Sequence, residues 1–128
     1  MRLHVGCGEN YLENFVNIEL PQNRHLKADV YANIFDLDYK EKSIEEIYLS
    51  HVFEHFDRIE SLLLLGKFNF WLKNNGILNI ITPDFEENIK SFLSGLLSYE
   101  EKQKILRHIF GTHEADWAVH RDGWYYEK

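Results

Sequence analysis

Residues 3–20, LHVGCGENYLENFVNIEL, decide how this chain is expected to fold. Two largely apolar runs, residues 3–5 and 15–20, stand on either side of the turn Gly6-Cys7-Gly8, and each is typical of a buried strand. Glycine lets the backbone bend sharply and approach a ligand closely, because no Cβ atom stands in the way. The stretch therefore predicts two strands joined by a tight turn, and residues 9–14 leave space for about one helical turn.

Alternating strands and helices are predicted along the rest of the chain. Further strands are expected at residues 28–31, 44–49 and 77–81, and the last, a nearly continuous apolar run, is expected to be central and buried on both faces. Helices are expected at residues 57–73, 86–97 and 99–110, and residues 36–42 and the tail from residue 111 are expected to be irregular. This order predicts an α/β fold with a Rossmann-like, mostly parallel sheet, flanking helices and a site at the carboxyl ends of the strands.

The helix at residues 57–73 is the most strongly signalled of the three. Asp57 is placed to cap its start, and Asn75-Gly76 is placed to end it. The apolar residues that recur at helical spacing are Ile59, Leu62, Leu63, Phe70 and Leu72.

Length and composition limit the classes of protein to consider. A chain of 128 residues, 45% of them hydrophobic, predicts one domain over residues 1–128. The net charge of −7 disfavours a nucleic-acid partner, and the apolar runs are too short to span a bilayer, so no membrane partner is expected. The single cysteine, Cys7, cannot form an internal disulfide, and a cytoplasmic location is the expectation.

An acidic residue follows the glycine turn at the end of the next strand. Glu19 is placed to accept hydrogen bonds from the hydroxyls of a ribose. The third glycine of a dinucleotide motif is missing, because Gly8 is followed by Glu9-Asn10-Tyr11, and this disfavours a pyrophosphate cofactor. An adenosine-containing ligand fits these residues, and the alternative is a plain turn followed by a solvated glutamate.

Five segments extend together over nearly the whole chain: LHVGCGENYLENFVNIEL, ADVYANI, SIEEIYLSHVFEHF, LKNNGILNIITPDFE and HRDGW. In this order they resemble the small predicted S-adenosylmethionine-dependent methyltransferases of class I. The resemblance implies a cofactor, S-adenosylmethionine, with S-adenosylhomocysteine as product. It implies cofactor-binding roles for Gly6, Cys7, Gly8, Asn10, Tyr11, Glu19, Leu20, Asn33, Ile34, Ser50, His51 and Val52.

The resemblance also implies what each part of this set binds. Residues 6–8 would wrap the methionine part, Glu19 would hold the ribose, and residues 50–52 would form the floor beneath the sulfonium. Asn33 would lie beside the adenine, where many relatives carry Asp, and its side-chain oxygen can accept a hydrogen bond from the adenine amino group.

Two departures from the family pattern bear on the fold. The interval from Gly8 to Glu19 is short for class I methyltransferases generally. Those domains also end with two further strands, one of them antiparallel, and this sequence stops at Lys128. A C-terminally truncated domain with an exposed sheet edge is therefore expected, and such an edge motivates a homodimer through the sheet edge or the C-terminal region.

A zinc hydrolase is the rival interpretation. The stretch His51-Val52-Phe53-Glu54-His55 matches the H-x-x-E-H pattern, in which two histidines on a helix bind zinc beside a general-base glutamate. The third ligand would be His113, Glu114, Asp116 or His120. The stretch directly follows a predicted strand and precedes the cap Asp57, so at most one turn is expected there, and this disfavours the pattern.

The residues that would do chemistry remain candidates. His51, His55 and Asp84 are the candidate bases for an acceptor hydroxyl or amine; the alternative role of His55 is a bond to backbone, and that of Asp84 is a helix cap. A possible acceptor pocket or lid is formed by His113, Glu114, Asp116, Trp117, His120, Arg121, Asp122 and Trp124. The predicted function is methyl transfer to a small-molecule or glycan-related acceptor, and the further alternative is a domain that binds the cofactor without turnover.

Overall fold

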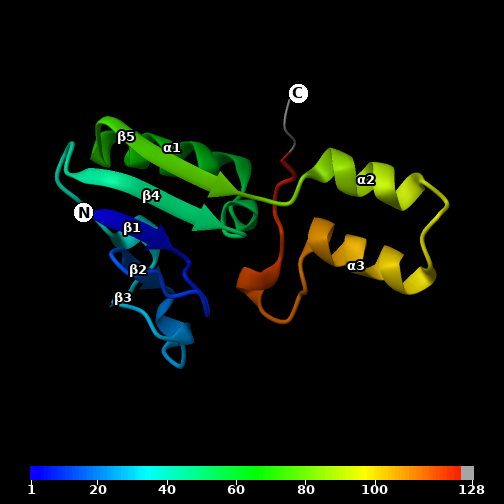
Figure 1. Ribbon diagram of the computed structural model, residues 1–128. Coiled ribbons are helices and arrows are strands. Elements are labelled where there is room, and N and C mark those ends of the chain that lie inside the picture. Colours follow the sequence, from blue (N-terminus) through cyan, green and yellow to red (C-terminus); the bar gives the residue numbers. More distant parts are fainter. Residues whose placement is uncertain (125–128) are drawn as a thin grey trace.

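The computed structural model describes residues 1–124 and contains, within them, one five-stranded sheet in which every strand pair is parallel. The spatial order is β3-β2-β1-β4-β5 (Figure 1). The strands are β1 (Arg2–Val5), β2 (Val16–Glu19), β3 (Val30–Tyr31), β4 (Ile44–Ser50) and β5 (Leu72–Ile81). The predicted Rossmann-like α/β fold is confirmed, and all five strands end at the same edge of the sheet.

The connection from β1 to β2 contains turns rather than a helix. Leu3 pairs with Val16 and Val5 pairs with Ile18, so the chain returns to a parallel register after only ten residues. The amides of Gly6 and Cys7 donate to the carbonyl of Ile18 at 2.9 and 3.1 Å. These bonds hold the glycine turn directly above β2.

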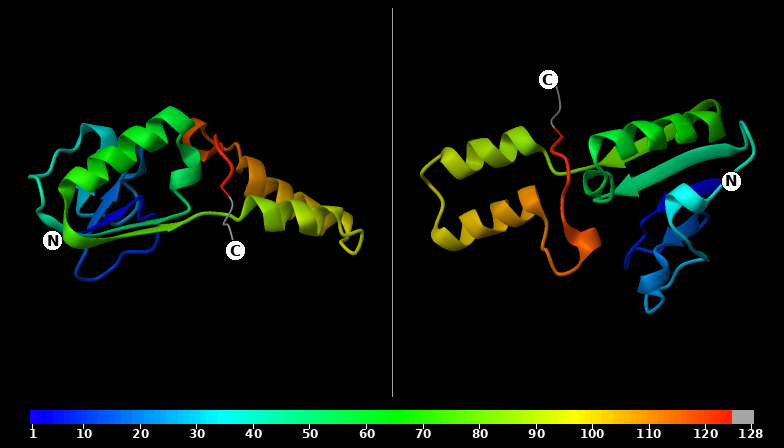
Figure 2. Two further views of the ribbon diagram at one scale, coloured as in Figure 1. Left: turned by 90° about the horizontal axis from the view of Figure 1, so that it is seen from above. Right: turned by 180° about the vertical axis from the view of Figure 1, so that it is seen from behind.

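Helix α1 (Arg58–Trp71) packs against one face of β4 and β5 (Figures 1 and 2). Asp57 caps it as predicted, since its carboxylate accepts from the amides of Ile59 and Glu60 at 2.9 Å. Its buried residues Ser61, Leu64, Phe68 and Trp71 help to form the core, which also contains Leu3, Val5, Ile18, Ile34, Ile44, Ile47, Leu49 and Phe53.

The apolar residues whose spacing predicted this helix are not the residues that it buries. The side chains at that spacing, Ile59, Leu62, Leu63 and Phe70, are exposed. Apolar residues occur almost all around residues 58–71, so the spacing predicts a helix but does not select the face that packs.

Strand β5 differs most from its prediction. It begins at Leu72, directly after α1, and not at residue 77. Leu72 pairs with Ile44 and Ile77 with Glu46, so residues 73–76 form an irregular bulge that contains the expected Asn75-Gly76 turn. The strand lies at the edge of the sheet and is not central, and Ile77 and Ile81 remain 54% and 45% exposed.

Helices α2 (Phe85–Leu93) and α3 (Tyr99–Phe110) form a hairpin that extends away from the sheet (Figure 2). The helix predicted over residues 86–97 is too long at its C-terminal end, since α2 ends at Leu93, before Gly95. Both helices lie wholly in the described part of the chain, and no residue of either is buried. The following segment returns to the sheet through the short 3-10 helix η4 (Asp116–Ala118).

The helices within residues 1–124 are all too short or too polar to cross a membrane.

Candidate functional site

A cavity of about 690 Å³ opens where β1, β2 and β4 end. Parallel sheets of this type bind ligands at this edge. Its wall consists of His4, Val5, Gly6, Cys7, Gly8, Asn10, Leu12, Ile18, Glu19, Leu20, Asn23, Leu26, Ala32, Asn33, Ile34, Phe35, Tyr48, Ser50, His51, Val52, His55, Phe56, Glu60, Asp116, Trp117 and Arg121. The volume is within the range for drug-sized ligands, about 300–1,000 Å³.

The glycine turn forms one side of the cavity, and two of its positions have a backbone conformation that favours glycine. Gly6 and Gly8 have φ of +65° and +53°, in the left-handed region that side chains rarely adopt. A Cβ atom at Gly6 would lie 2.4 Å from Cγ2 of Val52. At Gly8 a Cβ atom would meet nothing within 4 Å, so the backbone there borders open space.

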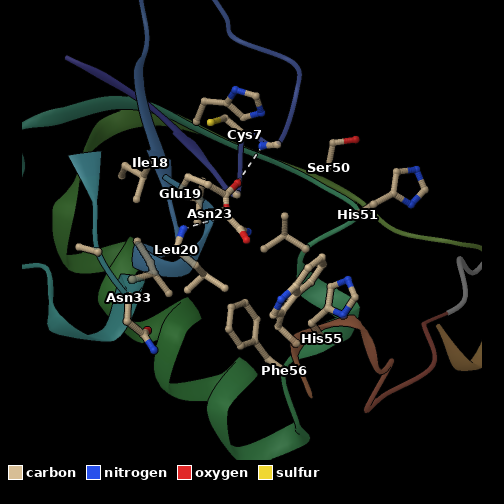
Figure 3. Close-up of a pocket in the computed structure, with 18 of the residues that line it drawn as sticks. Cys7, Ile18, Glu19, Leu20, Asn23, Asn33, Ser50, His51, His55 and Phe56 are labelled. Atoms are coloured by element: carbon tan, nitrogen blue, oxygen red, sulfur yellow. Dashed lines mark hydrogen bonds between the residues drawn. The ribbon is translucent and has the colours of Figure 1, made fainter. Parts of the chain in front are cut away.

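Glu19 is buried at the end of β2 and is held in place by three hydrogen bonds. Oε2 accepts from the Gly8 amide at 2.8 Å, and Oε1 accepts from the Leu20 amide at 2.8 Å and from Nδ2 of Asn23 at 3.0 Å. Figure 3 shows Glu19 close to Leu20 and Asn23, with His55 and Phe56 on the other side of the cavity. The carboxylate thus joins the glycine turn to the end of β2.

The remaining predicted cofactor residues are mostly in the same wall. Ile34, Ser50, His51 and Val52 line it, and so does Asn33, whose side-chain oxygen caps the 3-10 helix η2 (Ile34–Asp36) by accepting from the Phe35 amide at 3.0 Å. His51 has φ +56° and is held by a 2.8 Å bond from its amide to the carbonyl of Ile81.

Tyr11 and Asp84 are the two predicted cofactor or base residues that the structure does not bring to the cavity. The wall also lacks five residues of the predicted acceptor pocket, His113, Glu114, His120, Asp122 and Trp124. The Tyr11 hydroxyl donates to Oδ1 of Asp29 at 2.8 Å, and Nζ of Lys27 lies 3.7 Å from the centroid of its ring. Asp84 caps α2 by accepting from the Glu87 amide at 3.1 Å. The geometry therefore supports a helix cap, rather than a base, as the role of Asp84.

Sequence reasoning missed several wall residues. Asn23 gives no signal of its own, because its role is to bond Glu19. Phe35, Tyr48 and Phe56 are aromatic residues whose direction depends on tertiary packing. Three tail residues that were predicted as a possible acceptor pocket, Asp116, Trp117 and Arg121, do line the cavity.

The stretch that matches the H-x-x-E-H pattern does not form the α-helix that the pattern requires. It contains only the 3-10 helix η3 (Phe53–His55). Nδ1 of His55 donates to the carbonyl of Val119 at 3.1 Å, the backbone bond that was one of its two expected roles. His55 also lines the cavity. Its Nδ1 has a structural partner, so Nε2 is the ring nitrogen that could act as a base.

Cys7 is buried within the turn, and its Sγ donates to the carbonyl of Lys27 at 3.7 Å. Burial, with a smaller contribution from the charge of Glu19, raises the pKa of this thiol to about 11. The thiol therefore stays protonated at neutral pH, and Cys7 is a packing residue rather than a nucleophile.

No protein-family model matches the sequence, and a search of curated proteins finds no match. The cavity at the strand ends is therefore the feature that bears on function.

Proposed function

We propose that this chain is an S-adenosylmethionine-dependent methyltransferase of the class I type, acting on a small-molecule or glycan-related acceptor. The observation that carries the proposal is the 2.8 Å hydrogen bond from the Gly8 amide to Glu19, because it joins the glycine turn and the ribose-type carboxylate in one cavity wall. This wall lies at the ligand-binding edge of a parallel sheet.

The residues present fit an adenosine-type ligand. A carboxylate has about four acceptor positions, and Glu19 uses three of them within the protein, so one remains for a ribose hydroxyl. Open space beside Gly8 leaves room for a ligand against the backbone. Asn33 retains a lone pair on its oxygen and its amide hydrogens for an adenine ring.

When bound, the cofactor would supply an electrophilic methyl group on a positively charged sulfonium. The protein would then have to align the acceptor with that methyl group and remove the acceptor's proton. His51 and His55 are the predicted bases that line the cavity. Asp116, Trp117 and Arg121 would bind the acceptor, because they reach the same cavity from a different part of the chain.

The proposal includes two statements about the protein's setting. A cytoplasmic location suits a single buried thiol that forms no disulfide. A homodimer through the sheet edge or the C-terminal region stays a prediction, and β5 is an open edge among the described strands. A monomer by light scattering at high micromolar concentration would contradict the dimer.

Calorimetric titration of S-adenosylmethionine and S-adenosylhomocysteine into the metal-free protein tests the function. We expect micromolar binding that weakens at least tenfold, or about 1.4 kcal/mol, in Glu19→Gln. Glu41→Gln, an exposed change that lies outside the cavity wall, serves as the matched control and should bind as the original chain does. No binding by a folded sample overturns the proposal.

Turnover is tested separately with a panel of hydroxyl- and amine-bearing acceptors. Formation of S-adenosylhomocysteine that depends on an acceptor supports a methyltransferase. Tight binding without product from any acceptor instead supports a domain that holds the cofactor without turnover.

A further inference from the structure

Three potential metal ligands meet where the C-terminal segment returns to the sheet. They are Glu54, His55 and His120, and one ligand atom from each lies within 4.8 Å of the others. Glu54 and His55 belong to η3, whereas His120 follows η4. Backbone bonds hold the two segments together, since the amide of Arg121 donates to the carbonyl of Glu54 at 2.8 Å.

Both imidazoles are oriented as metal ligands usually are. Nδ1 of His55 donates to the carbonyl of Val119 at 3.1 Å, and Nδ1 of His120 donates to the carbonyl of His108 at 2.9 Å. A carbonyl can only accept, so in each neutral ring the proton is on Nδ1 and Nε2 carries the lone pair. A ring N–H bonded to a backbone carbonyl is the usual support of a metal-binding histidine.

Glu54 supplies the second, independent observation. The residue is 2% exposed, and neither carboxylate oxygen has a hydrogen-bond partner among residues 1–124. Its neighbours are Nε2 of His120 at 3.9 Å and Nδ1 of the exposed His51 at 3.4 Å, both measured to Oε1. A buried carboxylate without hydrogen bonds is costly and needs a compensating charge.

We propose that the carboxylate of Glu54 and the Nε2 atoms of His55 and His120 bind one divalent transition-metal ion, for which Zn²⁺ is the best match. Two imidazoles and one carboxylate are a common Zn²⁺ ligand set, and they leave a position for water or for an oxygen of a bound molecule. In tetrahedral Zn²⁺ sites the ligand atoms lie about 3.4 Å apart, whereas these atoms lie within 4.8 Å of one another, so the side chains would have to close by up to about 1.4 Å around the ion.

This site differs from the H-x-x-E-H interpretation in its ligands. There the glutamate is a base and His51 is a ligand, whereas here Glu54 itself binds the ion in place of His51, and His120, one of the third ligands considered there, completes the set. The site does not depend on the methyltransferase proposal, but an ion on Nε2 of His55 would leave His51 as the base for methyl transfer, because Nδ1 of His55 is bonded to the Val119 carbonyl. Because His55 lines the cavity as well, the ion would lie beside the cavity wall.

Zinc titration of the chelator-treated protein tests the site, with bound metal measured by elemental analysis. We expect one Zn²⁺ per chain and a higher midpoint of thermal unfolding, while Mg²⁺, which prefers oxygen ligands, should give no shift. Glu54→Gln and His120→Gln should each weaken Zn²⁺ binding at least tenfold. His25→Gln, a change in an exposed histidine outside the cluster, is the matched control and should not.

The stability of Glu54→Gln separates a metal site from a purely structural pair. Without metal this variant should be at least as stable as the original chain, because it removes a buried charge that lacks hydrogen bonds. With Zn²⁺ the order should reverse.

Two outcomes overturn the proposal. The first is Zn²⁺ well below one ion per chain in the original protein, which needs no variant to fold. The second is equal Zn²⁺ binding by the original chain and both ligand variants.

Discussion

Replacement of Gly6 by alanine tests whether the turn at the end of β1 is shaped by both its backbone conformation and its contact with Val52. Alanine in the left-handed region costs roughly 1–2 kcal/mol. The new Cβ atom would also lie 2.4 Å from Cγ2 of Val52, and overpacking of this kind costs about 1–3 kcal/mol. We therefore expect Gly6→Ala to lower the free energy of unfolding by about 2–5 kcal/mol.

Gly95→Ala is the matched control, because Gly95 also has a positive φ, +73°, but a Cβ atom there would meet nothing within 4 Å. It should show only the backbone cost. Val52→Ala should relieve the clash, so the double variant Gly6→Ala/Val52→Ala should be more stable than the sum of the single changes predicts, by about 1–3 kcal/mol. Urea unfolding followed by tryptophan fluorescence gives each free energy. Equal costs at Gly6 and Gly95, or simple additivity with Val52, would refute the reasoning.

Three further changes test individual contacts. Glu19→Gln should lower the free energy of unfolding by about 2–4 kcal/mol, because the side-chain NH₂ group of glutamine would face a backbone N–H that now donates to the carboxylate. A loss under about 0.5 kcal/mol in urea unfolding would contradict this. Asp122 bonds Arg58 through Nε at 2.7 Å and Nη2 at 2.8 Å, which lowers the pKa of the carboxyl group. Its stabilising contribution is present above the unfolded pKa, about 3.9, and is lost as pH falls through the lower folded value, so Asp122→Asn should flatten acid unfolding below about pH 4. Burial lowers the pKa of His4, so below about pH 6.5 the unfolded chain binds a proton that the folded chain does not, and stability falls by at most about 1.4 kcal/mol per pH unit. His4→Gln should remove that slope between pH 6.5 and 5, and an unchanged slope would show that another group titrates.

Local patterns were enough to predict the parallel sheet, the glycine turn and Glu19, whereas the other predicted cofactor residues of the cavity wall came from the family resemblance. The glycine turn and Glu19 lie at strand ends, and strand ends of a parallel sheet meet at one edge whatever the details of packing. The caps Asp57 and Asp84 are equally local, because a cap bonds amides only two or three residues away.

What could not be predicted depends on distant parts of the chain. The apolar run of β5 does not reveal that no described strand pairs with its outer edge. Tyr11 follows the glycine turn as a cofactor residue would, but its hydroxyl donates to Asp29, which the pairing of β2 and β3 brings close. The partnership of Glu54 with His120 likewise requires the tail to return to η3 after two helices.

The hairpin of α2 and α3 separates the two stretches of sequence that build the cavity. Its base is fixed on both sides, since Asp84 forms a bridge with Trp124 and Gly111 forms a bridge with Val119. Its tip around Gly95 is exposed, and lengthening a flexible loop twofold costs only about 0.6 kcal/mol. A peptide or fluorescent label inserted at the tip would therefore leave both bridges in place, so this is the position at which the chain can be extended without disturbing the cavity.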